Sequence, residues 1–252
     1  MTDSQWHHIR ELFENRSQMG RPRELDLRQV VNAVLYILAT GAHWRICLSV
    51  IRAWQSVYYY FRKFERNGTS MRVHERLRAE VRRKSGKHKH PSAGCLDSQS
   101  VKTVGVSSCF GYEAGKKVKG RKRHILVDTL GLLLIVVVTV ADLQDRDGAK
   151  LLFGRLTGSC KKLRKIWVDG GYRGQLLDWV KSNFKFVLAV VLRSEEQSGF
   201  CVLPRRWVVE RTLAWLNHQR RLSKDYEVFP KTSETFILIA MTRLMLRRVQ
   251  PL

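Results

Sequence analysis

Acidic residues are scarce in this chain of 252 residues. Asp and Glu together number 22 against 46 Lys and Arg, so the formal net charge at pH 7 is +24. The excess is spread along the chain, with +10 over residues 1–90 and +14 over residues 91–252. A charge of this size and spread favours a polyanionic partner that contacts both halves of the chain.

Long apolar runs and paired cysteines are also missing. The longest run without Asp, Glu, Lys or Arg covers residues 29–44, and its 16 residues fall short of the roughly 20 that a membrane-spanning helix needs. The uncharged run over residues 129–141, with 13 residues, is shorter still. The first residues have neither a basic start nor an apolar core, unlike a secretory signal. The five cysteines include no CxxC pair, so we expect reduced thiols rather than zinc ligands. Together these absences predict a cytoplasmic, nucleoid-associated protein without a membrane segment.

The chain is expected to divide into two domains near residue 90. Residues 82–92 are basic, hydrophilic and contain a proline, which is the composition of a linker. In residues 1–90, apolar side chains recur at helical spacing and predict helices over 4–15, 26–40 and 51–66 and a fourth ending near residue 83. This small all-α domain is compatible with a helix-turn-helix DNA reader, but equally with a plain bundle in which Trp54, Tyr58 and Phe61 are core residues.

Residues 91–252 change to strands that alternate with helices. The pattern predicts strands over 93–97, 124–128, 132–141, 165–169 and 186–192, and helices over 147–156, 172–183, 205–221 and 233–248. The order of these elements is typical of an α/β fold, the ribonuclease-H-like mixed sheet with flanking helices.

Three carboxylates in the second domain are candidates for a metal site. Asp97 and Asp169 each end a predicted strand, and the carboxyl ends of strands are where open sheets build their sites. Glu210 lies in the middle of a predicted helix, where an unpaired anion on the apolar face would be costly. Three converging carboxylates would repel one another unless divalent cations held them, which is the arrangement of two-metal phosphoryl transfer. The alternative is that each candidate aspartate only caps a turn or a helix. We expect that role for the other aspartates around the predicted hairpin, Asp128, Asp142, Asp145 and Asp147.

The motifs around these carboxylates closely resemble transposases of bacterial insertion sequences of the Asp-Asp-Glu class, in the insertion-sequence-five group. The resemblance covers nearly the whole chain, through MTDSQW (1–6), GRPR (20–23), WQSVYYYF (54–61), DSQSVK (97–102), GKKVKGRKRH (115–124), DRDGA (145–149), DGGYRG (169–174) and LPRRWVVERT (203–212). It implies that Asp97, Asp169 and Glu210 are the catalytic residues and hold two Mg²⁺ ions, with Mn²⁺ as an alternative. It further implies that the protein binds double-stranded DNA, both the terminal inverted repeats and the target. Water would be the first nucleophile and a freed 3′-hydroxyl the second. The resemblance also implies a homodimer in the synapse.

The sequence departs from the wider family's signature around the glutamate. That signature places Tyr, Arg, Glu and Lys at fixed spacing, and here Arg206 and Glu210 match while Leu203 replaces the Tyr and Asn217 the Lys. In the family this lysine contacts DNA, and in this chain Arg220 or Arg221 is the candidate to make that contact.

Basic side chains near the predicted site are candidates for DNA contact. The stretch from Lys116 to His124 carries six Lys or Arg, which we expect on a loop that neutralises phosphates, although such runs are often merely solvated. The full candidate set is Lys102, Lys116, Lys117, Lys119, Arg121, Lys122, Arg123, Arg173, Arg206, Arg220 and Arg221. By contrast, Arg243, Arg247 and Arg248 are expected on a solvated face, and Trp179, Trp207 and Trp215 in the core, although a tryptophan near Glu210 could stack on a flipped base.

Three other functions compete with transposition. A nuclease of the same fold would hydrolyse DNA without joining strands, and an inactive copy would only bind DNA. A tyrosine recombinase using one of Tyr58 to Tyr60 or Tyr226 lacks the accompanying Arg and His site.

Overall fold

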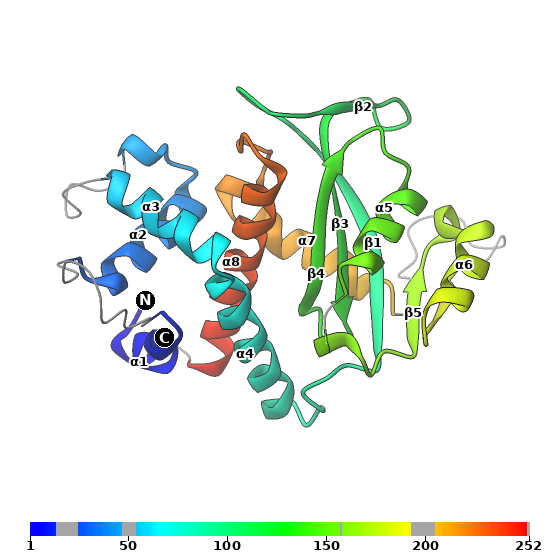
Figure 1. The fold of residues 1–252 in the computed structure, drawn as a ribbon, viewed down its shortest axis with the longest axis horizontal. Helices are drawn as coiled ribbons and strands as arrows, with labels where there is room; N and C mark the ends of the chain where they lie inside the picture. Colours follow the sequence, from blue (N-terminus) through cyan, green and yellow to red (C-terminus); the bar gives the residue numbers. More distant parts are fainter. Residues whose placement is uncertain (14–24, 47–53, 157, 193–204, 251–252) are drawn as a thin grey trace.

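The computed structural model describes residues 1–13, 25–46, 54–156, 158–192 and 205–250 (Figure 1). Its first part contains the helices α1 (Asp3–Ile9), α2 (Leu27–Thr40), α3 (Trp54–Arg66) and α4 (Thr69–Lys84). The second part contains β1 (Ala93–Lys102), β2 (Gly111–Glu113), β3 (Val118–Asp128), β4 (Leu133–Val140), α5 (Asp145–Gly154), β5 (Lys165–Val168), α6 (Gln175–Asn183), β6 (Val187–Val190), α7 (Trp207–Asn217) and α8 (Pro230–Val249). Within the described residues, no helix is both long and apolar enough to cross a membrane.

Local capping sets the bounds of the first helices. Asp26 caps α2 by accepting a hydrogen bond from the backbone of Arg28 (2.9 Å), and Gly41 ends the helix in the left-handed conformation with φ 73°. Both ends match the prediction. The first helix begins earlier than predicted because Thr2, rather than Ser4, forms a capping box with Gln5.

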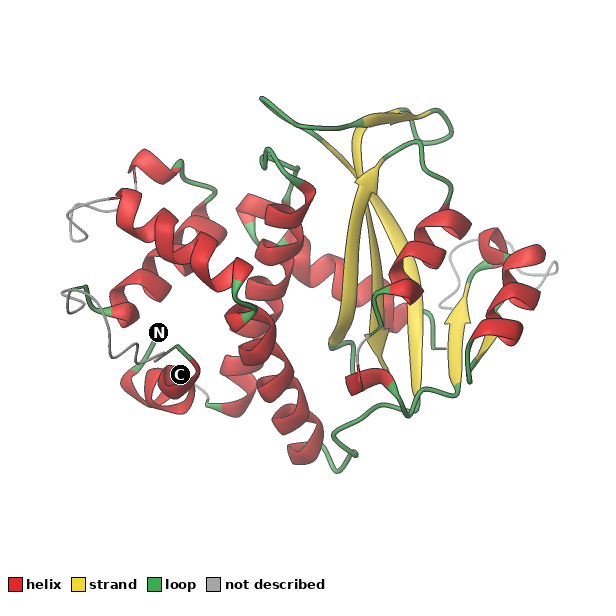
Figure 2. Ribbon diagram, in the orientation of Figure 1, coloured by secondary structure: helices red, strands yellow, loops and turns green. Residues whose placement is uncertain are grey.

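The strands form one mixed sheet, which confirms the predicted ribonuclease-H-like fold. Strand β3 pairs antiparallel with β1 on one side and with β4 on the other, while β1, β5 and β6 run parallel to one another. Helices cover the sheet, and Figure 2 shows the strands gathered in one layer beside the helices of the first part. The short strand β2, which pairs with the beginning of β3, was not predicted.

Two strands are longer than the sequence pattern predicts. β1 continues past Asp97 to Lys102, and β3 begins at Val118, inside the stretch predicted to be a basic loop. The two extensions pair with each other in antiparallel register as far as Lys102 and Gly120. A Cβ at Gly120 would lie 2.0 Å from the carbonyl oxygen of Val101, so this close approach of backbones requires glycine.

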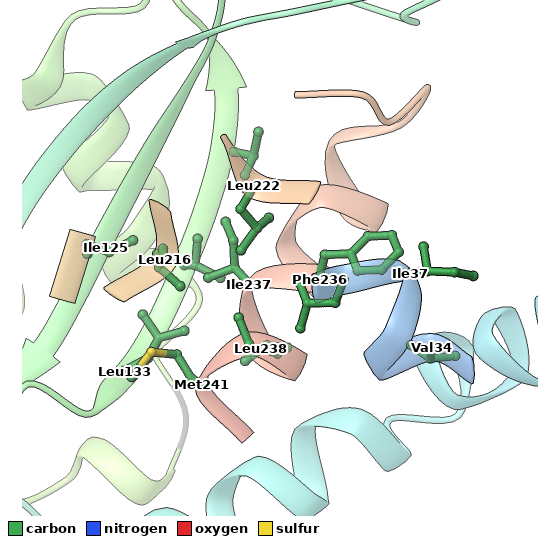
Figure 3. Close-up of a cluster of buried hydrophobic side chains, with 14 of the residues drawn as sticks. Val34, Ile37, Ile125, Leu133, Leu216, Leu222, Phe236, Ile237, Leu238 and Met241 are labelled. Carbon is green, nitrogen blue, oxygen red and sulfur yellow. The ribbon is translucent and has the colours of Figure 1, made fainter. Parts of the chain in front are cut away.

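The helical part and the sheet share one hydrophobic core. Its buried residues come from α2, α3, the sheet, α7 and α8. Helix α8 lies between the N-terminal helices and the sheet (Figure 1), and Figure 3 shows Phe236 on the side of Ile37 of α2 and Ile237 on the side of Leu216 of α7. The proposed division at residue 90 stays a prediction, as does the helix-turn-helix interpretation, because residues 47–53 lie outside the described part.

A buried polar pair also ties α4 to the sheet. Arg82 forms an ion pair with Asp128, whose other oxygen accepts hydrogen bonds from the backbone of Leu130 (2.8 Å) and Leu132 (2.9 Å) in the turn between β3 and β4. Asp128 therefore shapes the turn, as predicted, and fixes the position of the helix.

Helix α5 approaches the sheet closely at Gly148. A Cβ there would lie 2.1 Å from the His124 ring, so any other residue would displace the helix. His124 is buried and its Nε2 lies 3.0 Å from Thr139 Oγ1. Burial lowers its pKa to about 4, and the charge of Lys122 acts in the same direction while Asp145 opposes it.

This buried histidine makes the fold sensitive to acid. The unfolded chain takes up a proton near pH 6.5 and the folded chain only near pH 4, so stability is lost as pH falls from 7 towards 4. Between pH 7 and pH 5, wild type should lose about 2 kcal/mol more than His124→Gln, measured by urea unfolding. His218→Gln, at an exposed histidine, is the control. Equal losses in wild type and His124→Gln would contradict the assignment.

Candidate active site

Asp97 and Asp169 lie side by side on neighbouring strands. The parallel register of β1 and β5 pairs Ala93 with Lys165 and Cys95 with Trp167, and the same offset places Asp97 beside Asp169 just past the end of β5. Adjacent strands are roughly 4.8 Å apart, which brings the two carboxylates to one point on the sheet. Asp169 ends its strand as predicted, and Gly171 donates a backbone hydrogen bond to it (2.8 Å). Asp97 lies within its strand instead, so its predicted position at a strand end is wrong.

Glu210 reaches the same point from α7. It lies in the first turn of this helix and its side chain is 48% exposed, so the expected position in mid-helix on a buried face is wrong. Helix α7 begins at Trp207 rather than at Arg205. Arg205 has a φ of 70°, which lies in the left-handed region, so it cannot be part of a right-handed helix.

All three carboxylates surround one guanidinium group. Nη2 of Arg206 lies 3.3 Å from Asp97 Oδ2, 3.7 Å from Asp169 Oδ2 and 3.9 Å from Glu210 Oε1. The Arg206 side chain is 13% exposed, and its buried Nε has no hydrogen-bond partner among the described residues. The predicted site residues therefore come together, with one shared counter-ion at their centre.

Asp97 has the most perturbed environment of the three. Burial raises its pKa to about 6, although a backbone hydrogen bond from Ser98 and the charge of Arg206 both lower it. A desolvated carboxylate with a second aspartate beside it needs a cation, which Arg206 supplies here. In the described part of the chain, no group of three or more His, Cys, Asp and Glu side chains is already arranged to hold a metal ion.

Two hydrogen bonds fix α7 and the segment just before it relative to the sheet. Cys95 Sγ donates to the carbonyl oxygen of Arg205 (3.1 Å), and Thr212 Oγ1 donates to the carbonyl oxygen of Gly131 (2.9 Å) in the turn between β3 and β4. Burial raises the pKa of Cys95 to about 12, so it is a structural thiol. These contacts determine how far Glu210 lies from the two aspartates.

Three consecutive basic residues of β3 do not face solvent, which corrects part of the predicted DNA-contact set. Arg121, Lys122 and Arg123 are all buried. Arg121 pairs with the buried Asp225 (3.4 Å) and donates to the carbonyls of Glu227 and Val228, and Arg123 donates to the carbonyls of Leu222 and Lys224. The two arginines alternate along the strand and so share one face, where they hold the segment between α7 and α8.

Lys122 points to the opposite face of the sheet. Its Nζ lies 3.1 Å from Asp145 and donates to the carbonyl oxygen of Leu143 (2.9 Å), which fixes the beginning of α5. Side chains engaged in this way are unavailable to a phosphate, so the predicted DNA contacts of all three residues are wrong.

Arg221 is corrected for the same reason. It is buried, forms an ion pair with Glu227 (2.6 Å) and donates to the carbonyl oxygen of Ala42. Arg220 is exposed, as are Lys102, Lys116, Lys117, Lys119 and Arg173, and DNA contact by these residues stays a prediction. Asn217 is exposed at the end of α7, while Leu203 lies outside the described residues.

A polar cluster behind Asp97 was not predicted. Ser98 Oγ donates to Asp145 (2.8 Å), which also receives Lys122, and Ser100 hydrogen-bonds Glu113. The sequence did contain one signal for this cluster: Ser98 and Ser100 follow a site aspartate and are two residues apart, so they lie on the same face of the strand. The partners were not predictable because they lie on other elements.

Two families of known proteins match this chain. Residues 88–245 match a family described as "Transposase DDE domain", and residues 1–74 match a family described as "Putative transposase of IS4/5 family". A protein of Burkholderia cepacia, "Putative transposase for insertion sequence element IS402", is 30% identical over 115 residues. That alignment covers 43% of this chain and 54% of the relative, so the chain spans about half of the relative's length.

One solved structure is also similar, described as "Crystal structure of the Mos1 Strand Transfer Complex". It is 11% identical, and the match covers 94% of this chain and 80% of that chain with a TM-score of 0.23. The fold assignment therefore depends on the strand order described above.

The burial of Arg121 gives a test that separates a structural from a DNA-contacting role. Arg121→Gln leaves the Asp225 carboxylate buried without its cation and should lower the free energy of unfolding by about 3–5 kcal/mol, measured by urea denaturation. Lys119→Gln, two residues away and exposed, should change it by less than about 0.5 kcal/mol. Similar costs for the two variants would show that Arg121 is not the structural anchor.

Proposed function

Since the chain belongs to the family of transposases with a DDE domain, we propose that it binds the terminal inverted repeats of an insertion sequence and catalyses metal-dependent DNA strand cleavage and strand transfer. The match to that family covers residues 88–245, well over half of the chain. The observation that carries the proposal is the convergence of Asp97, Asp169 and Glu210 around Arg206.

The donor set fits a hard divalent cation. Carboxylate oxygens from three elements are the ligands that Mg²⁺ accepts, and Asp97, Asp169 and Glu210 would hold two such ions. Bound there, the ions would supply Lewis-acid stabilisation of the charge that develops on the phosphate. Because Nη2 of Arg206 now lies between the three carboxylates, its guanidinium must move aside for the ions to enter.

The chain's own residues position this reaction. The backbone of Ser98 and of Gly171 donates to Asp97 and Asp169, which leaves the other oxygen of each carboxylate directed at the common centre. When displaced, Arg206 remains within reach of the scissile phosphate and can pair with it bidentately. In this proposal water is the nucleophile of cleavage, and the freed 3′-hydroxyl attacks target DNA at the same centre.

Partners follow from the charge and the chemistry. Four exposed lysines lie where β1 ends and β3 begins. Lys102 is the last residue of β1, Lys116 and Lys117 lie between β2 and β3, and Lys119 is the second residue of β3. We assign these lysines to contacts with the DNA backbone. Joining two element ends requires that both be held at once, so we propose a homodimer in the synapse, acting on DNA of the bacterial nucleoid.

Incubation with end DNA and a target plasmid tests this function. Cleaved and joined products should form with Mg²⁺ and vanish with EDTA, and Asp97→Asn or Glu210→Gln should reduce them roughly 100-fold or more because each removes a ligand charge. Asp178→Asn, an exposed aspartate of α6, should retain activity. Cleavage without joining would indicate a nuclease of the same fold. Tight binding to the ends without any cutting would indicate an inactive, DNA-binding copy.

The central arginine yields a second test that needs no DNA. Arg206→Gln leaves three carboxylates without their shared counter-ion, so its free energy of unfolding in EDTA should fall by about 1–3 kcal/mol. Saturating Mg²⁺ should restore most of that loss, while it should stabilise wild type less. Arg205→Gln, adjacent but stacked on Trp167 instead, is the matched control. If Mg²⁺ stabilises wild type and Arg206→Gln equally, Arg206 does not occupy the metal position.

A further inference from the structure

Beside Glu210, α7 carries a ladder of stacked tryptophans and arginines. The Arg211 guanidinium lies 4.4 Å from the centre of the Trp207 ring and 4.6 Å from that of Trp215, and the Arg248 guanidinium of α8 lies 4.7 Å from the Trp215 ring centre. Trp207 is 41% exposed, which contradicts its predicted place in the core. Because Trp207, Arg211 and Trp215 are four residues apart, they form one stripe along the helix.

Four arginines gather on the same surface. Arg211, Arg243, Arg247 and Arg248 form no ion pair within the described residues, although many other arginines of this chain do. Arg211 donates to the carbonyl oxygen of Leu130 (3.1 Å) and Arg243 to Gln219 (2.9 Å), so both are held in place by neutral groups. Hydrogen bonds thus fix Arg211 and Arg243, and Arg248 stacks on Trp215, in a cluster of positive charge that has no ion pair among the described residues.

Burial first, and repulsion between neighbouring arginines second, lower pKa values in this cluster. Burial and the charge of Arg211 lower the pKa of Arg248, while the charge of Asp128 acts in the opposite direction. Burial and the charge of Arg247 lower the pKa of Arg243. Stacking on tryptophan offsets only about 0.5–1 kcal/mol at each exposed contact. A polyanion would remove the repulsion, and these residues are thus not the plain solvated face that the sequence predicts.

The surface also has the shape to receive a ligand. A hollow of about 480 Å³ lies between the end of α7 and the last turns of α8, and Trp215, His218, Gln219, Arg243, Arg247 and Arg248 line it. Within the ladder, Trp207 lies three residues before Glu210 and Arg211 lies one residue after it, about 100° round the helix. At 1.5 Å per residue, His218 lies about 12 Å beyond Glu210. That length corresponds to roughly three to four base-pair steps.

We propose that Trp207, Arg211, Trp215 and Arg248, together with Arg243 and Arg247, form a phosphate-binding track for the duplex DNA next to the scissile phosphate. The inference rests on the proposed function, since it takes Glu210 as part of the site that cuts DNA. The arginines bind successive phosphates of the backbone, and the tryptophans hold Arg211 and Arg248 at fixed positions without neutralising them. The track supplies the cation that the family lysine would provide at Asn217.

The salt dependence of binding counts these contacts directly. Full-length protein in EDTA, which prevents cutting, is titrated with a fluorescent duplex of the element's end over a range of KCl concentrations. Each lost phosphate contact reduces the steepness of log K against log salt by about 0.9. Arg243→Gln with Arg247→Gln should therefore reduce it by about 1.8 and weaken binding roughly 10-fold or more at moderate salt. Lys181→Gln with Lys185→Gln, two exposed lysines at and just after α6, removes the same charge far from the track and should change the slope little.

The outcomes separate this inference from the proposed function. Equal slopes for the track and control variants, with wild type binding normally, would overturn the track and leave the transposase proposal intact. Failure of wild type to bind any duplex would overturn both. Arg247→Glu alone, at an exposed position with little risk to folding, repeats the test if the double variant unfolds. A loss confined to unpaired DNA, caused by Trp207→Ala and not by the arginine variants, would overturn the track by showing that the surface takes a flipped base instead.

Discussion

Strand β3 is the constraint around which this molecule is organised. It is paired on both edges and covered on both faces, yet it carries three consecutive basic residues, Arg121, Lys122 and Arg123. A buried charge without a partner is costly, so each of these side chains must find acceptors on another element. The alternation of the strand sends Arg121 and Arg123 to the segment before α8 and Lys122 to the beginning of α5. The strand thereby fixes both helical layers relative to the aspartates of β1 and β5.

The sequence was sufficient for the parts of the site that depend on local pattern. Helix α2 begins after Asp26 and ends before Gly41, as predicted, and the order of strands and helices identified the fold. The motifs brought Asp97, Asp169 and Glu210 together as candidates, and the structure places them around one point. The role of Arg206 as their shared counter-ion could not be predicted, because it depends on how far α7 lies from the sheet, which Cys95 and Thr212 determine through contacts distant in sequence.

The errors have a common physical cause. A run of Lys and Arg looks the same in sequence whether it lies in solvent or in a strand, and only the partners decide. The pattern predicts DNA contacts for Arg121 and Arg221, but each has a buried carboxylate, Asp225 or Glu227, that becomes its neighbour only in the fold. Conversely, the pattern predicts mere solvation for the arginines near the end of α8, whereas Arg243 is hydrogen-bonded to Gln219 and Arg248 stacks on Trp215.

The position of α8 has a consequence for how the protein is made. This helix, residues 230–249, lies between the N-terminal helices and the sheet and supplies Phe236 to the side of α2. Gln5 near the start of the chain hydrogen-bonds to the backbone of Gln250 (2.9 Å). Helices α1 to α4 therefore leave the ribosome with their main apolar face uncovered and must wait for α8 before they can pack fully. Assembly of the carboxylate site is thus coupled to synthesis of the chain as far as residue 249, and nascent chains would expose an apolar helical surface that chaperones are suited to shield.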